Sequence, residues 1–239
     1  MVMSNVIKER YLAVLEKISS SEISSGRSQN SVKLIVVTKG QPAAKINEAI
    51  AAGAYLLGEN YPEETVKKIP EITGDVEWHM IGHLQSRKIK HIVDHFKMIH
   101  SIDRDEIALK LDAQLGAGKK VMQALFEVNL SGESSKSGYV AWDENTWEVL
   151  CDHFLELMEL KSLKFCGLMT MPPYANDPEE SRYVFKKCRK LLNMMQNRIG
   201  ATNFNQLSMG TSLDYQVAIQ EGATFVRIGE AIMGKRIYR

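Results

Sequence analysis

Hydrophobic and polar positions divide the chain into two parts with different periodicities. Residues 4–20 carry apolar side chains at helical spacing, among them Tyr11, Val14 and Ile18, which predicts an amphipathic helix. The polar stretch SSSEISSGRSQN then runs to Asn30 without periodicity, so we expect a loop there. After it, short apolar runs alternate with helix-like segments along the rest of the chain.

The apolar runs predict eight buried strands. They are rich in β-branched and aromatic residues and mostly lack polar alternation, which is typical of parallel strands covered on both faces. The runs span residues 33–40, 54–60, 77–83, 97–103, 122–130, 164–171, 205–211 and 223–229. Segments such as SRKIKHIVDHF between them predict helices, and a long one has Pro178 in its first turn and Gly200 at its end.

This alternation indicates an α/β fold, a (β/α)8 TIM-type barrel with an extra N-terminal helix. The length of 239 residues suits one such barrel, so we expect a single domain over residues 1–239. An open doubly wound sheet is the alternative, but it usually has fewer strands and a glycine fingerprint after the first one. No GxGxxG sequence occurs in the chain.

Composition narrows the class of protein. The net charge of +1, from 30 basic and 29 acidic residues, predicts no binding to nucleic acid or to an anionic membrane and fits a binder of small molecules. The three cysteines form no CxxC pair, which argues against disulfides and a structural zinc site. Charged residues interrupt the N-terminus, and no apolar run reaches the ~18 residues of a membrane span. We therefore expect a cytoplasmic protein.

One lysine stands out at a strand end, where TIM barrels place their functional residues. Lys39 follows the apolar sequence LIVVT. Burial of an ammonium group lowers its pKa, and the neutral amine is a nucleophile toward aldehydes. The alternative is that Lys39 only extends its charge into solvent.

Glycines follow the seventh and eighth predicted strands, where this fold often binds phosphate. Gly210 and Gly229 would let backbone N–H groups approach phosphate oxygens, and a helix N-terminus would add its positive dipole. Thr211 or Ser212, with Asp214 beside them, are expected to cap the helix that follows. The alternative is that both glycines are ordinary turn residues.

Arg227 lies in the last predicted strand. An arginine only donates hydrogen bonds, so opposite a pyridine nitrogen it would keep that nitrogen unprotonated. Pyridoxal 5′-phosphate (PLP) held in this way is a poor electron sink. A structural ion pair to a nearby acid is the alternative.

The histidines do not predict a metal site. His79 and His83 are four residues apart, but they lie in a predicted strand and turn and not on a helix. His91 and His95 have the same spacing but lack the glutamate of an HExxH motif.

Seven motifs, in order, resemble the PLP homeostasis protein family. They are VTKGQP, LLGENYPEE, EWHMIGHLQSRK, NLSGESSKSG, GLMTM, LSMGTSLDYQVAI and VRIGEAIMG, and the resemblance runs from about residue 33 to 236. Members of this family are single-domain relatives of the N-terminal barrel of bacterial alanine racemase. The resemblance therefore supports the predicted barrel.

The resemblance implies a set of cofactor-binding residues. Lys39 would carry PLP as an internal aldimine, and Arg227 would face the pyridine nitrogen. Asn60, His79 and Met169 would border the ring. The phosphate would be held by Ser208, Met209, Gly210, Thr211, Gly229 and Glu230.

The chain departs from the family at a few positions near these residues. Glu230 stands where threonine or serine is usual, and Thr211 where methionine is common. A carboxylate beside a phosphate is repulsive, so we expect Glu230 to turn its side chain away. Gly40 and Gln41 replace a more polar pair after the lysine.

The resemblance implies a protein that stores or delivers PLP, with PLP-dependent apo-enzymes as recipients, and not an enzyme. A PLP-dependent amino-acid racemase is the alternative, but racemisation needs two bases, one on each face of the substrate. In alanine racemase the second base comes from an additional domain, which we do not expect in a chain ending at Arg239; Tyr174 is the only substitute we can suggest. A barrel aldolase using Lys39 without PLP is a third class.

Two expectations concern the surroundings of the site. Lys136, in the GESSKSG loop, is a second amine that would accept PLP during release, or else a solvated loop lysine. No sequence feature indicates a large interface, so we expect a monomer or weak dimer.

Overall fold

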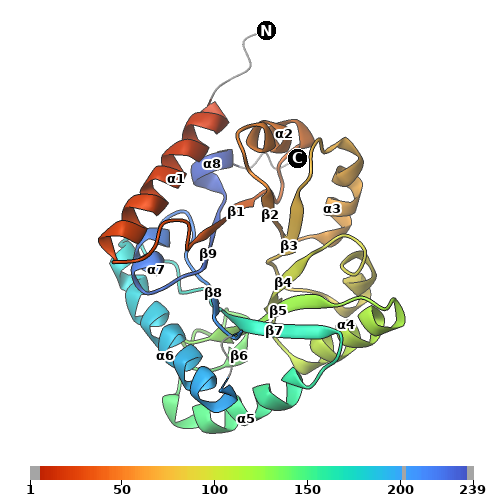
Figure 1. The fold of residues 1–239 in the computed structure, drawn as a ribbon, viewed down its shortest axis with the longest axis vertical. Coiled ribbons are helices and arrows are strands. Elements are labelled where there is room, and N and C mark those ends of the chain that lie inside the picture. Colours follow the sequence, from red (N-terminus) through yellow and green to blue (C-terminus); the bar gives the residue numbers. More distant parts are fainter. Residues whose placement is uncertain (1–5, 201–202, 236–239) are drawn as a thin grey trace.

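The computed structural model describes residues 6–200 and 203–235, whose strands form a closed parallel barrel surrounded by helices (Figure 1). The strands are β1 Lys33–Val37, β2 Leu56–Glu59, β3 Glu77–Met80, β4 Met98–Ile102, β5 Met122–Asn129, β6 Tyr139–Val140, β7 Leu163–Met169, β8 Gln206–Ser208 and β9 Phe225–Ile228. They follow the order β4-β3-β2-β1-β9-β8-β7-β5-β6, and an additional pairing of β4 with β5 closes the ring. The two-residue β6 lies beside the end of β5. The predicted (β/α)8 barrel is confirmed.

Helices cover the outside of the barrel. The α-helices are α1 Val6–Ser24, α2 Ala43–Ala51, α3 Pro62–Lys68, α4 Asp105–Ala117, α5 Trp147–Met158, α6 Arg182–Ile199, α7 Tyr215–Gln220 and α8 Glu230–Met233. Short 3₁₀ helices are η1 Ile69–Glu71, η2 Ser86–His91, η3 Glu144–Thr146 and η4 Pro178–Ser181. None of these helices, within residues 6–200 and 203–235, has the length and apolar content to cross a bilayer.

The N-terminal helix is longer than predicted. The structure describes it from Val6, and it continues through the serine-rich stretch to Ser24. Glu22 explains the difference, because its buried carboxylate accepts hydrogen bonds from Asn30 N and Val32 N at 3.1 and 2.7 Å. A buried carboxylate with such partners stabilises a helix end that local polarity alone would not predict.

The segment after β3, which was predicted to be an α-helix, is a different kind of helix in the structure. Residues 86–91 form the 3₁₀ helix η2, which turns follow. Ile89 and Ile92 are both buried and are three residues apart, which matches the threefold period of a 3₁₀ helix. By contrast, α6 ends at Gly200 as predicted, with φ of 62° in the left-handed region.

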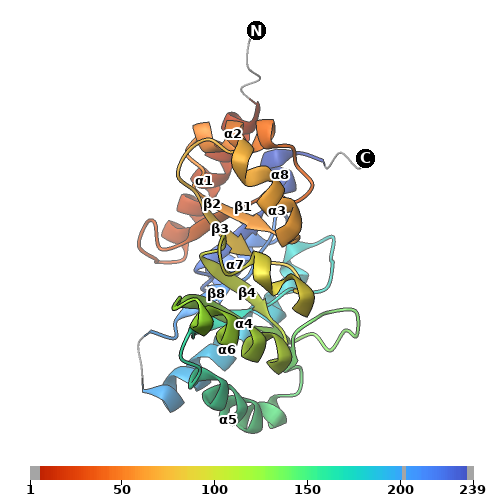
Figure 2. The ribbon, with the colours of Figure 1, turned by 90° about the vertical axis from the view of Figure 1, so that its right-hand side faces the viewer.

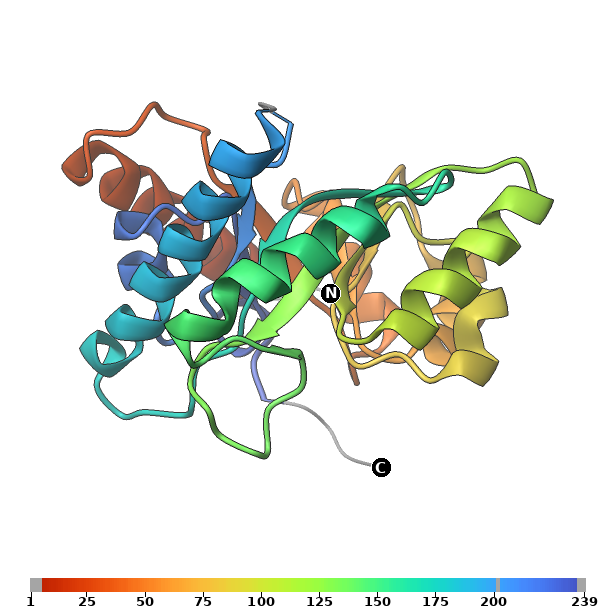
Figure 3. The ribbon, with the colours of Figure 1, turned by 90° about the horizontal axis from the view of Figure 1, so that it is seen from below.

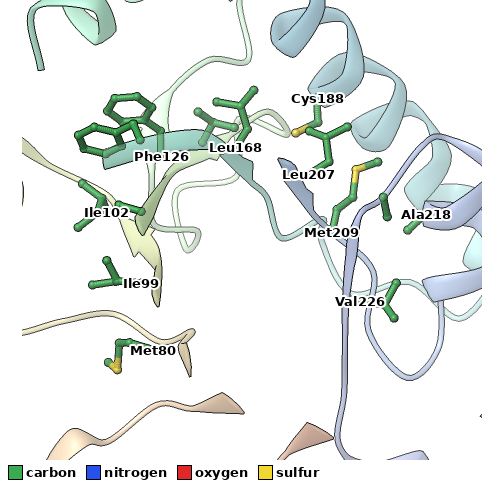
Figure 4. Close-up of a cluster of buried hydrophobic side chains, with 14 of the residues drawn as sticks. Met80, Ile99, Ile102, Phe126, Leu168, Cys188, Leu207, Met209, Ala218 and Val226 are labelled. Atoms are coloured by element: carbon green, nitrogen blue, oxygen red, sulfur yellow. The ribbon is translucent and has the colours of Figure 1, made fainter. Parts of the chain in front are cut away.

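Two apolar layers hold the barrel together. The larger one lies between strands and helices, where Phe126, Leu207, Met209 and Val226 point outward from the barrel (Figure 4). The smaller one lies inside the barrel and comprises Ile35, Leu56, Met98, Leu125, Cys166, Met169 and Phe225. Side chains mostly alternate between the two layers along the strands, with irregular pairing where β5 meets β4 and β7, and this pattern places several polar residues on the inner face.

The loops after β5 and β7 project from the same end of the barrel (Figures 2 and 3). This is the carboxyl end of the parallel strands. The last residues of several predicted strands belong to loops at this end: the run 33–40, for example, ends as a strand at Val37. The residues with candidate chemistry therefore lie mostly in loops.

Candidate functional site

A cavity of about 860 Å³ opens at the carboxyl end of the barrel. A volume of this order suits a ligand of small-molecule size. Its walls include seven of the predicted site residues, namely Lys39, Asn60, Met169, Thr211, Arg227, Gly229 and Glu230. Lys39, Gly229 and Glu230 also line an adjoining cavity of about 360 Å³. The other four predicted residues, His79, Ser208, Met209 and Gly210, lie behind these walls.

A tight turn presents Lys39 to the cavity. Gln41 N donates to Thr38 O at 3.0 Å, and Gly40, between Lys39 and Gln41, has φ of 68°. A turn of this kind requires positive φ at its third residue, which explains glycine at position 40. The residue directly after the lysine is therefore set by backbone geometry and not by ligand chemistry alone.

A buried ion pair anchors this turn. The fully buried Glu59 accepts hydrogen bonds from Thr38 Oγ1 at 2.7 Å and from Lys68 Nζ at 3.1 Å. Burial raises the pKa of Glu59, and the Lys68 ammonium opposes that rise. Neither Glu59 nor Lys68 was predicted from the sequence to take part in the site. The one indication of this ion pair in the sequence was a glutamate at the end of an apolar strand.

Arg227 lies on the inner face of β9 and is 4% exposed. Its guanidinium donates to Ser208 Oγ at 2.6 Å, to Thr170 O at 3.1 Å and to Met171 Sδ at 2.7 Å. All three partners are neutral, which differs from the structural ion pair considered above. Burial lowers the pKa of Arg227 to about 10, so the side chain stays charged at neutral pH and donates only.

A chain of polar side chains continues from Arg227 through the barrel interior. Ser208 Oγ lies 2.8 Å from His100 Nδ1, and His100 Nε2 lies 3.0 Å from His79 Nδ1. Burial lowers the pKa of His79 to about 4 and that of His100 well below its usual value, so both rings are neutral at pH 7. His79 thus supports Arg227 indirectly, through His100 and Ser208, and its side chain does not line the cavity.

The predicted phosphate segment divides between cavity and core. Met209 N donates to Phe225 O at 3.1 Å, and its side chain packs in the outer core (Figure 4). Gly210 has φ of 93°, and a Cβ there would lie 2.6 Å from Ala218 Cβ. It therefore allows the loop to pack closely on α7. Within the predicted segment 208–211, Thr211 alone borders the cavity.

Asp214 orders the loop that contains Thr211. Its Oδ1 accepts from Thr211 N at 2.6 Å and from Thr211 Oγ1 at 3.1 Å. We expected Asp214 to help cap α7. Its side chain instead accepts hydrogen bonds from the loop before it, and not from the first N–H groups of the helix. Ser212 Oγ accepts from Ala231 N at 3.4 Å, and Glu230 is exposed at the start of α8.

Two buried oxygen atoms in the cavity wall lack a hydrogen-bond partner among the described residues. They are Asn60 Oδ1 and Glu127 Oε2. A Cβ on Gly82 would lie 2.6 Å from Asn60 Cγ, so a glycine at 82 is what lets Asn60 occupy its place. Buried polar atoms are rarely unpaired, which indicates that a ligand with polar groups belongs in this cavity. The donor set fits PLP: an amine for the aldehyde, a buried cation opposite the ring, and a glycine-containing loop for the phosphate.

The rim of the cavity carries further polar groups that the sequence analysis did not combine. His83 Nδ1 lies 2.5 Å from Asp103 Oδ2, and the His83 ring is half exposed. Lys136 reaches the same cavity from the loop after β5. Asn129 holds that loop, because its Oδ1 accepts from the backbone N–H groups of Ser131 and Gly132 at 3.2 and 3.1 Å.

Comparison with known proteins identifies the family. Residues 23–236 match the family model described as "Alanine racemase, N-terminal domain". The chain is 38% identical over 231 residues to the pyridoxal phosphate homeostasis protein of Aquifex aeolicus, covering 96% of this chain and 98% of that protein. It is 37% identical to the protein of the same name from Escherichia coli K12, with 98% of each chain covered.

Similarity to solved structures leads to the same family. PipY of Synechococcus elongatus, solved with PLP bound, has a TM-score of 0.82 and 32% identity, covering 95% of this chain and all of PipY. Alanine racemase of Clostridium difficile shares the fold alone, with a TM-score of 0.64 and 13% identity over 91% of this chain and 55% of that enzyme. The chain therefore belongs to the pyridoxal phosphate homeostasis protein family, built on the N-terminal domain of alanine racemase.

Proposed function

We propose that this protein binds PLP as a Schiff base on Lys39 and takes part in PLP homeostasis inside the cell by storing and delivering the cofactor. The observation that carries the proposal is the cavity itself, which combines Lys39, the unpartnered Asn60 Oδ1 and the buried Arg227. The name of the relatives and the PLP bound to PipY support the same ligand. Residues from five strand ends would hold it, and no single motif would suffice.

Arg227 would set the electronic state of the bound ring. When bound, PLP supplies an aldehyde carbon for amines and a pyridine ring that withdraws electrons. A donor-only guanidinium opposite the pyridine nitrogen leaves that nitrogen without a proton. Ser208 and the two histidines behind it fix the guanidinium in place. This arrangement favours holding the cofactor over carbanion chemistry.

The phosphate would lie between the loop after β8 and the start of α8. Thr211, Ser212 and Gly229 border this part of the cavity, and a Cβ on Gly229 would lie 3.3 Å from Val37 Cβ. The exposed Glu230 has room to keep its carboxylate in solvent, away from the phosphate. Backbone N–H groups beside Gly229 would then be available to the anion.

Mass spectrometry after borohydride reduction tests the attachment. We expect a PLP adduct on Lys39 and absorbance in the near-violet, both absent in Lys39→Ala. Lys110→Ala is the matched control, because Lys110 is an exposed lysine on α4 that pairs with Glu106. Unchanged absorbance in Lys39→Ala would refute the proposal, and a colourless wild-type protein with an active lysine would favour the aldolase alternative.

A second test separates the carrier from the racemase. The cavity mouth has His83 and the highly exposed Tyr174, and neither is enclosed as a racemase base would require. We expect no exchange of the Cα proton of free amino acids in deuterated water, because exchange requires a base to remove that proton and binding alone does not. Exchange over many turnovers would contradict the carrier function.

A further inference from the structure

Glu127 is an acidic residue inside the barrel that the proposed function does not use. It lies on β5 between Phe126 and Val128, which face the outer core, so its side chain points inward. It lines the same cavity as Lys39 and is 7% exposed. Its Oε2 atom is buried and has no hydrogen-bond partner among the described residues. Such an atom in a cavity wall points to a ligand.

The surroundings of Glu127 favour its neutral form. Burial and, to a smaller extent, the carboxylate of Asp103, which follows β4, raise the pKa of Glu127 to about 7. Arg227 on β9 opposes this rise. The neighbour on β7 is Met169, which is paired with Glu127 in the sheet and carries no charge.

The other ionisable side chains that the structure describes in this cavity lie in loops or at the start of α8. They are Lys39, His83, Lys136, Tyr174, Asp214 and Glu230. Arg227, the only arginine among the described residues that line the cavity, donates hydrogen bonds to Ser208, Thr170 and Met171 and not to Glu127. A buried carboxylate without such a bond is costly, whereas a protonated carboxyl is a hydrogen-bond donor.

We propose that Glu127 is a ligand-contacting residue whose protonated carboxyl donates a hydrogen bond to the ring oxygen of bound PLP. This inference rests on the proposed function. The assignment follows by elimination among the acceptors of the ligand. Arg227 would take the ring nitrogen, and the loops after β8 and β9 would take the phosphate. Asn60 offers the ligand its unpartnered Oδ1, which is an acceptor, so the ring oxygen is left for the donor on β5. A bound anion also disfavours an ionised Glu127, so ligand and proton bind together.

Because binding of the ligand and of the proton are linked, this contact predicts whether the ligand affinity rises or falls with pH. The ligand binds the protonated form better, so its affinity is highest below pH 7 and falls as the pH rises through the pKa of Glu127. The fall approaches about tenfold per pH unit above that pKa. An anionic Glu127 that accepted a hydrogen bond from the ligand would give the opposite sign.

Calorimetric titration with 4′-deoxypyridoxine 5′-phosphate tests the inference. This analogue lacks the aldehyde, so it reports the cavity without bond formation to Lys39. We compare wild type with Glu127→Gln, which keeps the size and a donor at every pH, between pH 6 and 8.5. The affinity of wild type relative to Glu127→Gln should fall at least about tenfold over this range, because the ionisations of the analogue cancel in the ratio.

Controls make each outcome decisive. Glu16→Gln, an exposed change on α1, should behave as wild type. An analogue that also lacks the ring oxygen should bind both proteins with a constant ratio, and a ratio that still fell with pH would refute the assignment to that oxygen. A constant ratio with the first analogue would refute the role of Glu127, whereas a folded wild type that bound neither analogue would refute the proposed function.

The inference can be tested without a variant if Glu127→Gln fails to fold. Calorimetry of wild type in two buffers with different ionisation enthalpies measures protons taken up on binding. We expect net uptake above pH 7 with the first analogue, and less with the analogue that lacks the ring oxygen. Equal uptake with both analogues would overturn the proposal.

Discussion

The interior of the barrel contains titratable side chains that most proteins of this fold replace with apolar packing. His79 and His100 are the clearest case, because each is buried and each bonds the other. Their hydrogen bonds lead to Ser208 and from there to Arg227. At the scale of single residues, the position of the Arg227 guanidinium in the cavity wall thus depends on two neutral imidazoles.

These histidines should make the protein sensitive to mild acid. Unfolded histidine binds a proton near pH 6.5, whereas folded His79 does so only at about 4, so unfolding takes up protons between these values. The free energy of unfolding therefore decreases as the pH falls from 6.5, by roughly 2 kcal/mol at pH 5 from His79, and His100 adds to the loss in the same direction. Urea unfolding at pH 7.5 and pH 5 measures the loss.

Variants assign that loss to the buried pair. His79→Gln cannot titrate, so its stability should depend less on pH by about the share of one histidine, although it is less stable at pH 7.5 because the chain to Arg227 is altered. His95→Gln, at an exposed position, should keep the wild-type dependence. If wild type and His79→Gln lost the same free energy in acid, the buried ring would not be the source.

At the scale of elements, close approaches between strand ends and loops place the site residues. Gly82 follows β3 and lies against Asn60, which follows β2. The added Cβ of Gly82→Ala would come within 2.8 Å of the backbone Cα of Asn60, which a side-chain rotation cannot relieve. We expect PLP affinity to fall about tenfold and stability to fall by about 1–3 kcal/mol, as in overpacked cores.

Gly118→Ala is the matched control for this prediction. Gly118 ends α4 with negative φ, and a Cβ there would meet its neighbours at 3.5 Å or more, which is ordinary contact. Equilibrium binding of PLP and thermal unfolding measure both variants. Wild-type affinity in a folded Gly82→Ala would show that the position of Asn60 does not matter for binding.

At the scale of the whole molecule, the barrel was predictable because eight apolar runs alternate with helices, and that alternation has few solutions. The site was only partly predictable. Strand ends can be recognised from sequence, but which residues of a three-residue strand such as β8 face inward cannot. Ser208 and Met209 were therefore both assigned to the phosphate, although their side chains face opposite sides of the barrel wall. Glu127 was missed because a single acid in an apolar run gives no indication of what lies across the barrel.

The loop after β5 is the part of the structure on which the proposed delivery of PLP can be tested. It projects from the cavity end of the barrel (Figure 3), and its half-buried Lys136 lines the cavity. Asn129 Nδ2 donates to Glu133 O at 2.9 Å, which helps to fold the loop back toward the strand. A second amine at this place would displace that of Lys39 from the cofactor carbon during release, and the alternative remains a solvated lysine without a role.

Transfer kinetics decide between these two roles. We expect Lys136→Ala to bind PLP as tightly as wild type but to activate a PLP-dependent apo-enzyme several-fold more slowly, because the leaving step loses its acceptor amine. Lys161→Ala is the control, since Lys161 is an exposed lysine just before β7, at the opposite end of the barrel. Stopped-flow absorbance of the loaded protein mixed with apo-enzyme measures the rate. Equal rates for both variants and wild type would leave Lys136 without a part in transfer, and delivery would then proceed by direct dissociation from Lys39.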